Sequence, residues 1–132
     1  WEDMYNRYKE RSPYSLWTPD VMRDYCRFAV KATVATNQVA LCCTPETETS
    51  IYMGHFSRDL TNSLSKVDVP VTVLRGKVAA LRSGHKIDFL ASPTWPELAA
   101  AFSQGNDVYL PELTHFIPMQ DPALTAKYIS ET

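Results

Sequence analysis

Among the reactive side chains, His115 has the sequence context that best favours a catalytic role. Before it, Val108 to Leu110 form a short β-prone run that Pro111 ends, and after it Asp121-Pro122 offers a helix cap with proline at the first helical position. The histidine turn is therefore expected at the carboxyl edge of a parallel sheet, where α/β proteins bind ligands. An imidazole there can take and return a proton near neutral pH. The alternative for this residue is simple packing in a turn.

The other reactive side chains show weaker patterns. His55 and His85 stand apart from His115 and from the scattered acids without the spacing of metal ligands, so no metal site and no cofactor are predicted. The serines of Ser83-Gly84-His85 and Ser92-Pro93 lack the strained strand-to-helix setting that exposes a nucleophile. We interpret both as loops.

Composition narrows the functional classes. The 132 residues have 45% hydrophobic and 21% charged side chains, which is ordinary globular usage and enough for a sizeable core. The net charge of -2, with Lys and Arg scattered, argues against nucleic acid as a partner, and no apolar run is long enough to span a membrane. Cys26, Cys42 and Cys43 are odd in number and lack the spacing of metal ligands, which favours buried, reduced thiols and an intracellular, cytoplasmic location. The opening Trp1 is expected of a processed product, a fragment, or the ordered part of a longer chain.

Residues 1–66 are expected to be mainly helical. Trp1 to Glu10 is amphipathic, and Thr18-Pro19-Asp20 starts a second helix with its apolar side chains on one face. Val39 to Cys43 is apolar but too short to classify by periodicity, and Thr44-Pro45-Glu46 starts a helix that reaches about His55 or Phe56. A polar connector with one possible helical turn follows, up to residue 66.

Residues 67–132 carry a strand pattern. Val67 to Gly76 predicts a buried parallel strand, Thr94 to Glu97 is a capping box for a crossover helix, and Asp107 to Leu110 predicts the next strand. A final helix is expected from Pro122 to Ile129, which makes a βαβα unit with a right-handed crossover. Lys77 to Asp88 is expected to be a loop with a short helix. Since two parallel strands do not make a stable sheet, further strands are expected from elsewhere. Either an amino-terminal half is missing from this chain, or the helical first sixty residues cover the sheet.

These segments together resemble the last two strands of an α/β-hydrolase. The proline-led strand Val69 to Gly76, the strand Asp107 to Pro111 and the turn Thr114 to Pro122 match the family pattern, in which the last strand delivers the catalytic histidine before a final helix. The helix start Trp17 to Asp20 and the segment Val39 to Glu46 resemble the helical cap inserted over the active site in a fungal and yeast lipase-like subgroup. The resemblance implies an α/β fold in which residues 1–66 are a helical cap-like region and residues 67–132 are the carboxyl-terminal part of the core.

Two family features are missing from the sequence. It contains no G-x-S-x-G nucleophile elbow and no histidine-glycine oxyanion turn, both of which precede the cap in this family. The residues after Gly76, Lys77 to Leu81, include no carboxylate where the family usually places the acid that orients its histidine. Some members carry that acid before the cap. Asp88 is the fallback within this chain, although it is better interpreted as a solvated loop charge.

The sequence therefore predicts the carboxyl-terminal fragment of a serine-type hydrolase, esterase-like or lipase-like, that acts on an ester-like bond of an apolar small molecule. His115 is the expected general base, and the amino-terminal half of the core is the expected partner. The alternative is a non-catalytic hydrolase-like module that binds a small apolar ligand or a protein. Aromatic and methionine side chains of the cap are expected to form an apolar wall over the substrate, with core packing as the alternative for each one. These side chains are Trp17, Met22, Tyr25, Tyr52 and Met53.

Overall fold

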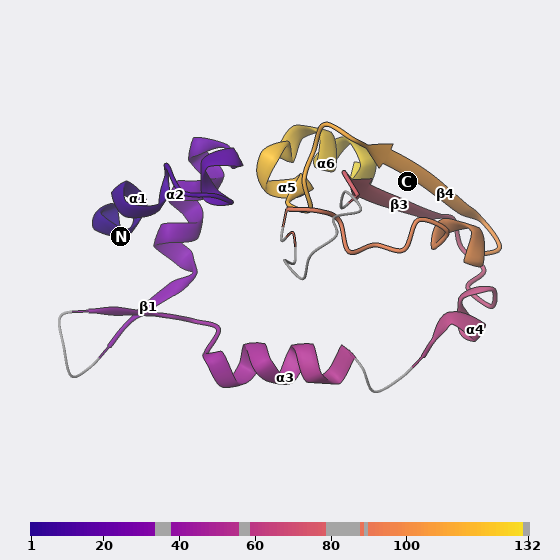
Figure 1. Ribbon diagram of the computed structural model, residues 1–132, viewed down its shortest axis with the longest axis horizontal. Helices are drawn as coiled ribbons and strands as arrows, with labels where there is room; N and C mark the ends of the chain where they lie inside the picture. Colours follow the sequence, from indigo (N-terminus) through magenta and orange to yellow (C-terminus); the bar gives the residue numbers. More distant parts are fainter. Residues whose placement is uncertain (34–37, 56–58, 79–87, 89, 131–132) are drawn as a thin grey trace. The chain divides into compact units, whose positions relative to one another are not determined.

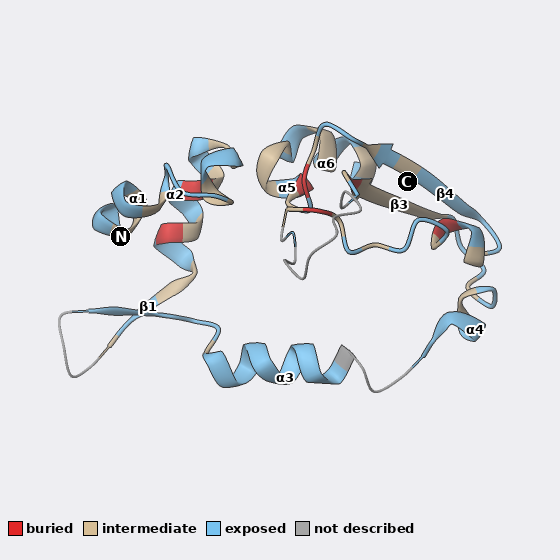
Figure 2. Cartoon of the chain, in the orientation of Figure 1, coloured by how far each residue is buried: buried red, intermediate tan, exposed pale blue. Residues whose placement is uncertain are grey.

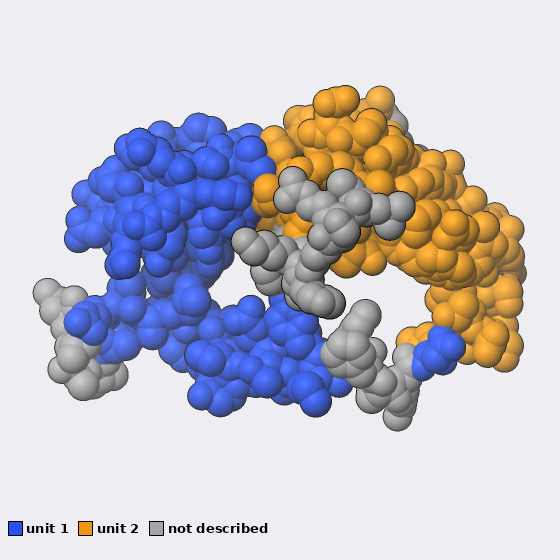
Figure 3. Space-filling model, viewed as in Figure 1, with its two compact units in different colours: residues 1–59 blue, residues 60–132 orange. Residues whose placement is uncertain are grey.

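The computed structural model describes residues 1–33, 38–55, 59–78, 88 and 90–130. The chain divides into two compact units, Trp1–Asp59 and Leu60–Thr132, which Figure 3 colours separately. The helices and strands of each unit are shown in Figure 1. In neither unit do the described residues include a helix long and apolar enough to cross a membrane.

The first unit begins with helices, as expected. These are α1 (Glu2–Tyr8), the 3-10 helix η1 (Tyr14–Leu16) and α2 (Pro19–Phe28). Thr18 has an extended backbone and Pro19 occupies the first position of α2, where its missing N–H costs no hydrogen bond. Among the described residues of this unit, the buried hydrophobic side chains are those of Met22 and Cys26, one turn apart on α2, the helix on which Figure 2 shows buried positions in red. The last residue of α2, Phe28, is 73% exposed, in contrast to the single apolar face that the sequence predicts for this helix.

A hairpin and a third helix complete the first unit. Strands β1 (Val30–Ala32) and β2 (Val39–Leu41) pair antiparallel, with Val30 opposite Leu41. Helix α3 (Pro45–His55) then begins where the sequence predicts, and the backbone N–H of Thr47 donates to the hydroxyl of Thr44 at 3.3 Å. All side chains of Pro45 to Gly54 are exposed (Figure 2).

The second unit contains the predicted parallel strands. Its elements are α4 (Thr61–Leu64), β3 (Val71–Gly76), the 3-10 helix η2 (Ala99–Ala101), β4 (Gly105–Leu110), α5 (Ile117–Gln120) and α6 (Pro122–Ser130). Strands β3 and β4 run parallel in a continuous register from Val71 opposite Gly105 to Gly76 opposite Leu110. Because the described sheet has two strands, β3 is half-buried along most of its length and fully buried at Gly76, in contrast to the fully buried strand that its sequence predicts.

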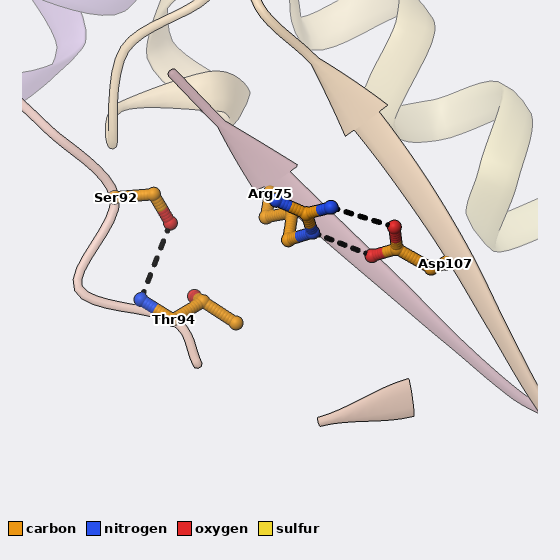
Figure 4. A network of polar contacts seen from close by, with 4 residues as sticks. All are labelled: Arg75, Ser92, Thr94 and Asp107. Carbon is orange, nitrogen blue, oxygen red and sulfur yellow. Dashed lines mark hydrogen bonds and ion pairs between the residues drawn. The ribbon is translucent and has the colours of Figure 1, made fainter. Parts of the chain in front are cut away.

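The crossover differs from the expected helix. Instead of a helix from Thr94, the chain forms tight turns and the single 3-10 turn η2. In η2 the backbone N–H of Ala101 donates to the carbonyl oxygen of Leu98 at 3.1 Å. The capping-box interpretation was wrong because Thr94 N–H donates to the Ser92 hydroxyl at 3.3 Å, which forms a local turn (Figure 4). The loop with a short helix predicted over Lys77 to Asp88 lies largely outside the described residues.

An ion pair joins the two strands on one face of the sheet. The Arg75 guanidinium donates to both carboxylate oxygens of Asp107, at 2.7 and 2.9 Å, as Figure 4 shows. Arg75 also lies over the ring of its cross-strand partner Tyr109, 4.5 Å from the ring centre. The hydrogen bonds from Arg75 hold the pKa of Asp107 below its ordinary value. A bidentate pair of this kind fixes the register that brings the two strand ends level.

Candidate functional site

The His115 turn follows β4 at the carboxyl edge of the sheet. Gly76 and Leu110 are paired as the last residues of their strands, so the chain leaves both strands at the same edge. The N–H of Lys77 then donates to the carbonyl of Leu113 at 2.7 Å, and the N–H of Leu113 donates to Leu110 at 3.0 Å. The backbone that precedes His115 is thereby bonded directly to the end of β3.

Gly76 permits this contact because it has no side chain. A β-carbon at this position would lie 2.3 Å from the carbonyl oxygen of Thr114 and 2.7 Å from that of Leu113. Both neighbours are backbone atoms, which cannot rotate away as a flexible side chain can. The glycine that closes β3 therefore lets the turn rest on the strand end.

The side chain of Gln120 holds the same turn from the other side. Its amide oxygen accepts the N–H of Thr114 at 2.8 Å and also the Thr114 hydroxyl. The Thr114 hydroxyl in turn accepts the N–H of Phe116 at 3.2 Å. Residues on both sides of His115 are thus fixed through one buried threonine, which is 5% exposed. Sequence reasoning missed Thr114 and Gln120, because a Gln at the end of a four-residue helix has no pattern of its own.

His115 itself is exposed at this edge. Its backbone N–H donates to the backbone carbonyl of Leu90 at 2.9 Å, and its imidazole ring lies 5.4 Å, centre to centre, from the ring of Phe116. Among the residues that the structure describes, no side chain bonds to an imidazole nitrogen. Asp88 is exposed and accepts the N–H of Leu90 at 3.0 Å, which agrees with its interpretation as a loop charge. Asp121 accepts the N–H of Leu124 at 2.8 Å and so caps α6.

The residues predicted to form an apolar wall separate into three settings, all within the first unit. Trp17 and Tyr25 belong to an aromatic cluster, with their ring centres 5.3 Å apart, and both rings also contact Tyr14. Met22 is buried in the core at 2% exposure. Tyr52 and Met53 are 66% and 67% exposed on α3.

A cavity of about 340 Å³ lies in the first unit, and Tyr25 is the member of the predicted wall that lines it. Burial, and then the neighbouring Tyr14, raise the pKa of Tyr25 to about 12. The Tyr25 hydroxyl therefore stays protonated in the cavity at physiological pH.

We expect Tyr25→Phe to remove a late step from the tyrosinate absorbance titration. Because the folded-state pKa is raised from 10.0 to about 12, the stabilising contribution of Tyr25 is complete below pH 10.0 and is lost as the pH rises towards 12. Absorbance titration of both proteins, with circular dichroism to check folding, measures this step. Identical curves near pH 12 would contradict the prediction.

The described residues include no cluster of three or more His, Cys, Asp or Glu that could hold a metal ion. His85 and the side chain of His55 lie outside the described set. All three cysteines are free, but only Cys26 is buried, and the expectation of buried thiols was wrong for Cys42 and Cys43, which the short hairpin leaves exposed. The sulfur of Cys42 lies 3.9 Å from the carbonyl oxygen of Phe28.

No protein-family description matches the chain, and no curated protein matches it. Among solved structures, the crystal structure of E-2-(acetamidomethylene)succinate hydrolase is similar to it, with a TM-score of 0.68 and 16% sequence identity. The similarity covers 98% of this chain and 44% of that hydrolase, so the chain spans less than half of its length. The likeness shows the fold: helices and a parallel sheet that match part of an α/β-hydrolase.

Proposed function

We propose that this chain supplies the cap and the histidine-bearing part of a serine-type hydrolase that cleaves an ester-like bond of an apolar small molecule. One observation carries the proposal: the parallel register of β3 and β4 brings the His115 turn to the carboxyl edge of the sheet. The structural likeness to a hydrolase over 98% of the chain supports the same interpretation. In this proposal residues 1–66 act as the cap, of the fungal and yeast lipase-like kind, and residues 67–132 belong to the core.

In the proposed reaction His115 acts first as a base and then as an acid. Its imidazole accepts the proton of a serine hydroxyl as the serine attacks the carbonyl carbon, and it returns this proton to the leaving alcohol, which leaves an acyl-serine. The imidazole then accepts a proton from a water molecule that attacks the acyl-serine and returns it to the serine oxygen, so that the acid is released. The serine, the oxyanion donors and a carboxylate that orients His115 come from the remaining part of the hydrolase core. The turn bonds to Leu90 and Gln120 hold the backbone on both sides of His115, and the proposed carboxylate from the remaining core would orient its ring.

The proposed contacts to substrate come from the first unit. Trp17, Met22, Tyr25, Tyr52 and Met53 are the residues proposed for the apolar wall. The exposure of Tyr52 and Met53 supports their availability for contact, whereas the 2% exposure of Met22 favours the core-packing alternative for that residue. The solved hydrolase acts, by its name, on E-2-(acetamidomethylene)succinate. At 16% identity its substrate is not carried over to this chain.

We expect residues 1–132 alone to hydrolyse no ester above the buffer background, because the sequence has no nucleophile elbow. The complete enzyme should turn over p-nitrophenyl butyrate and should be labelled by a fluorophosphonate on a serine outside these residues. Hydrolysis by residues 1–132 that survives removal of trace contaminants would contradict this expectation. A complete protein that is neither labelled nor active would instead support a non-catalytic binding module and overturn the proposed function.

A further inference from the structure

The cavity of about 340 Å³ in the first unit has walls of three chemical kinds. Tyr14 and Tyr25 contribute aromatic rings, Val39 and Leu41 contribute aliphatic side chains from β2, and α1 contributes charge. Its volume lies within the range of about 300 to 1,000 Å³ that is typical of small-molecule sites. All the lining residues belong to one unit, so the cavity does not depend on His115.

The aliphatic wall favours an apolar ligand body. Val39 and Leu41 are two residues apart on one strand, so their side chains lie on the same face of the hairpin. They are 50% and 48% exposed, which leaves apolar surface that a ligand can remove from water. Tyr14 and Tyr25, whose ring centres are 5.8 Å apart, add aromatic surface with little conformational freedom to lose.

The charged wall favours a single negative charge on the ligand. Arg7 lines the cavity and lies over the ring of Tyr8, 5.8 Å from its centre. Among the residues that the structure describes, no carboxylate lies within ion-pair distance of Arg7, so its guanidinium can donate to a ligand. Asp3, one turn earlier on α1, lines the same cavity and disfavours a second negative charge.

We propose that this cavity binds a small molecule with an apolar body and one anionic group, with the anion paired to Arg7 and the body against Val39 and Leu41. The pairing is a binding function beyond the proposed hydrolysis, and it stands whether or not His115 is catalytic. Tyr25 remains an uncharged hydroxyl at the cavity wall, because burial raises its pKa to about 12. The site therefore keeps Arg7 as its cation without an opposing phenolate.

Two fluorescent probes test the proposal on the full chain. The first is 8-anilinonaphthalene-1-sulfonate, which has an apolar body and one anionic group, and the second is N-phenyl-1-naphthylamine, which has the same body without the sulfonate. We expect Arg7→Met to weaken the binding of the sulfonate probe about tenfold or more, which is the effect of one lost charge-assisted hydrogen bond. The affinity for the neutral probe should change by no more than about twofold. Arg7→Lys should restore part of the loss, and Val39→Asp should weaken both probes.

Two control variants keep the test specific. Arg11→Met removes an equal charge that contacts Tyr8 from outside the cavity lining, and Ile51→Asp alters an exposed apolar residue of α3. Both controls should leave the binding of both probes unchanged. Equal weakening by Arg7→Met and Arg11→Met, binding that responds to Ile51→Asp but not to Val39→Asp, or no binding of the sulfonate probe would each overturn the proposal. Circular dichroism of each variant shows whether the helices persist.

Discussion

We expect His115→Ala to lower the turnover of the complete enzyme at least about 100-fold, because the proposed reaction would lose the group that carries its proton. Folding should be nearly unchanged, since the side chain is exposed and the turn is held by the backbone of His115 and by Thr114. The measurement is kcat with p-nitrophenyl butyrate beside the thermal unfolding midpoint of the same preparation. A fall in kcat without a fall in the midpoint separates lost chemistry from lost structure.

The matched control for this variant is His85→Ala, a histidine to which the sequence gives no chemical role. It should keep near-normal turnover. If His115→Ala also keeps near-normal turnover, His115 is a packing residue and the hydrolase function assigned to it is wrong. Fluorophosphonate labelling of the nucleophile offers a second readout, because a serine without its base reacts more slowly.

Gly76→Ala is expected to displace the His115 turn and to destabilise the second unit. The new methyl group would lie 2.3 Å from the carbonyl oxygen of Thr114, far inside any real contact, so the end of β3 and the turn must separate. Overpacking of this kind typically costs about 1–3 kcal/mol and at times more. Turnover of the complete enzyme should fall as well, because His115 moves with the turn.

Gly54→Ala supplies the comparison for this substitution. A β-carbon at Gly54 meets nothing within 4 Å, and because Gly54 lies in the last turn of α3, alanine there should change the stability little. Denaturant unfolding should therefore give a lower free energy of unfolding for Gly76→Ala than for the parent protein. Gly54→Ala should leave the free energy of unfolding unchanged or raise it. Equal stability of Gly76→Ala and the parent protein would show that the turn does not rest on Gly76.

The sequence predicted the elements whose signals are local and strong. Proline after a small polar residue marked the starts of α2, α3 and α6, and the structure places Pro19, Pro45 and Pro122 at the first residue of each helix. The β-branched run before Gly76 and the run ending at Leu110 predicted two parallel strands, and the observed register confirms them. A histidine turn after the second strand followed from the same pattern, whereas its catalytic role stays a prediction.

Features that depend on tertiary contacts could not be predicted in this way. The capping pattern at Thr94 predicted a helix, but the chain turns early and brings Ala99 close to Gly105. A β-carbon at Gly105 would lie 1.8 Å from the carbonyl oxygen of Ala99. Strand β1 has three residues, which is too few for periodicity to show. The bonds from Thr114 to Gln120 join a turn to a later helix, and no spacing rule describes them.

The exposure of helix α3 predicts how fast its backbone amides exchange with solvent. It has 11 residues, and every side chain from Pro45 to Gly54 is exposed. Helices shorter than about 12–15 residues are marginal in water unless packing supports them. The backbone amides of α3 should therefore exchange their hydrogens by local fraying, ahead of the paired amides of β3 and β4. Any surface that covers Ile51, Tyr52 and Met53 would slow this exchange along one helix and leave the sheet unaffected.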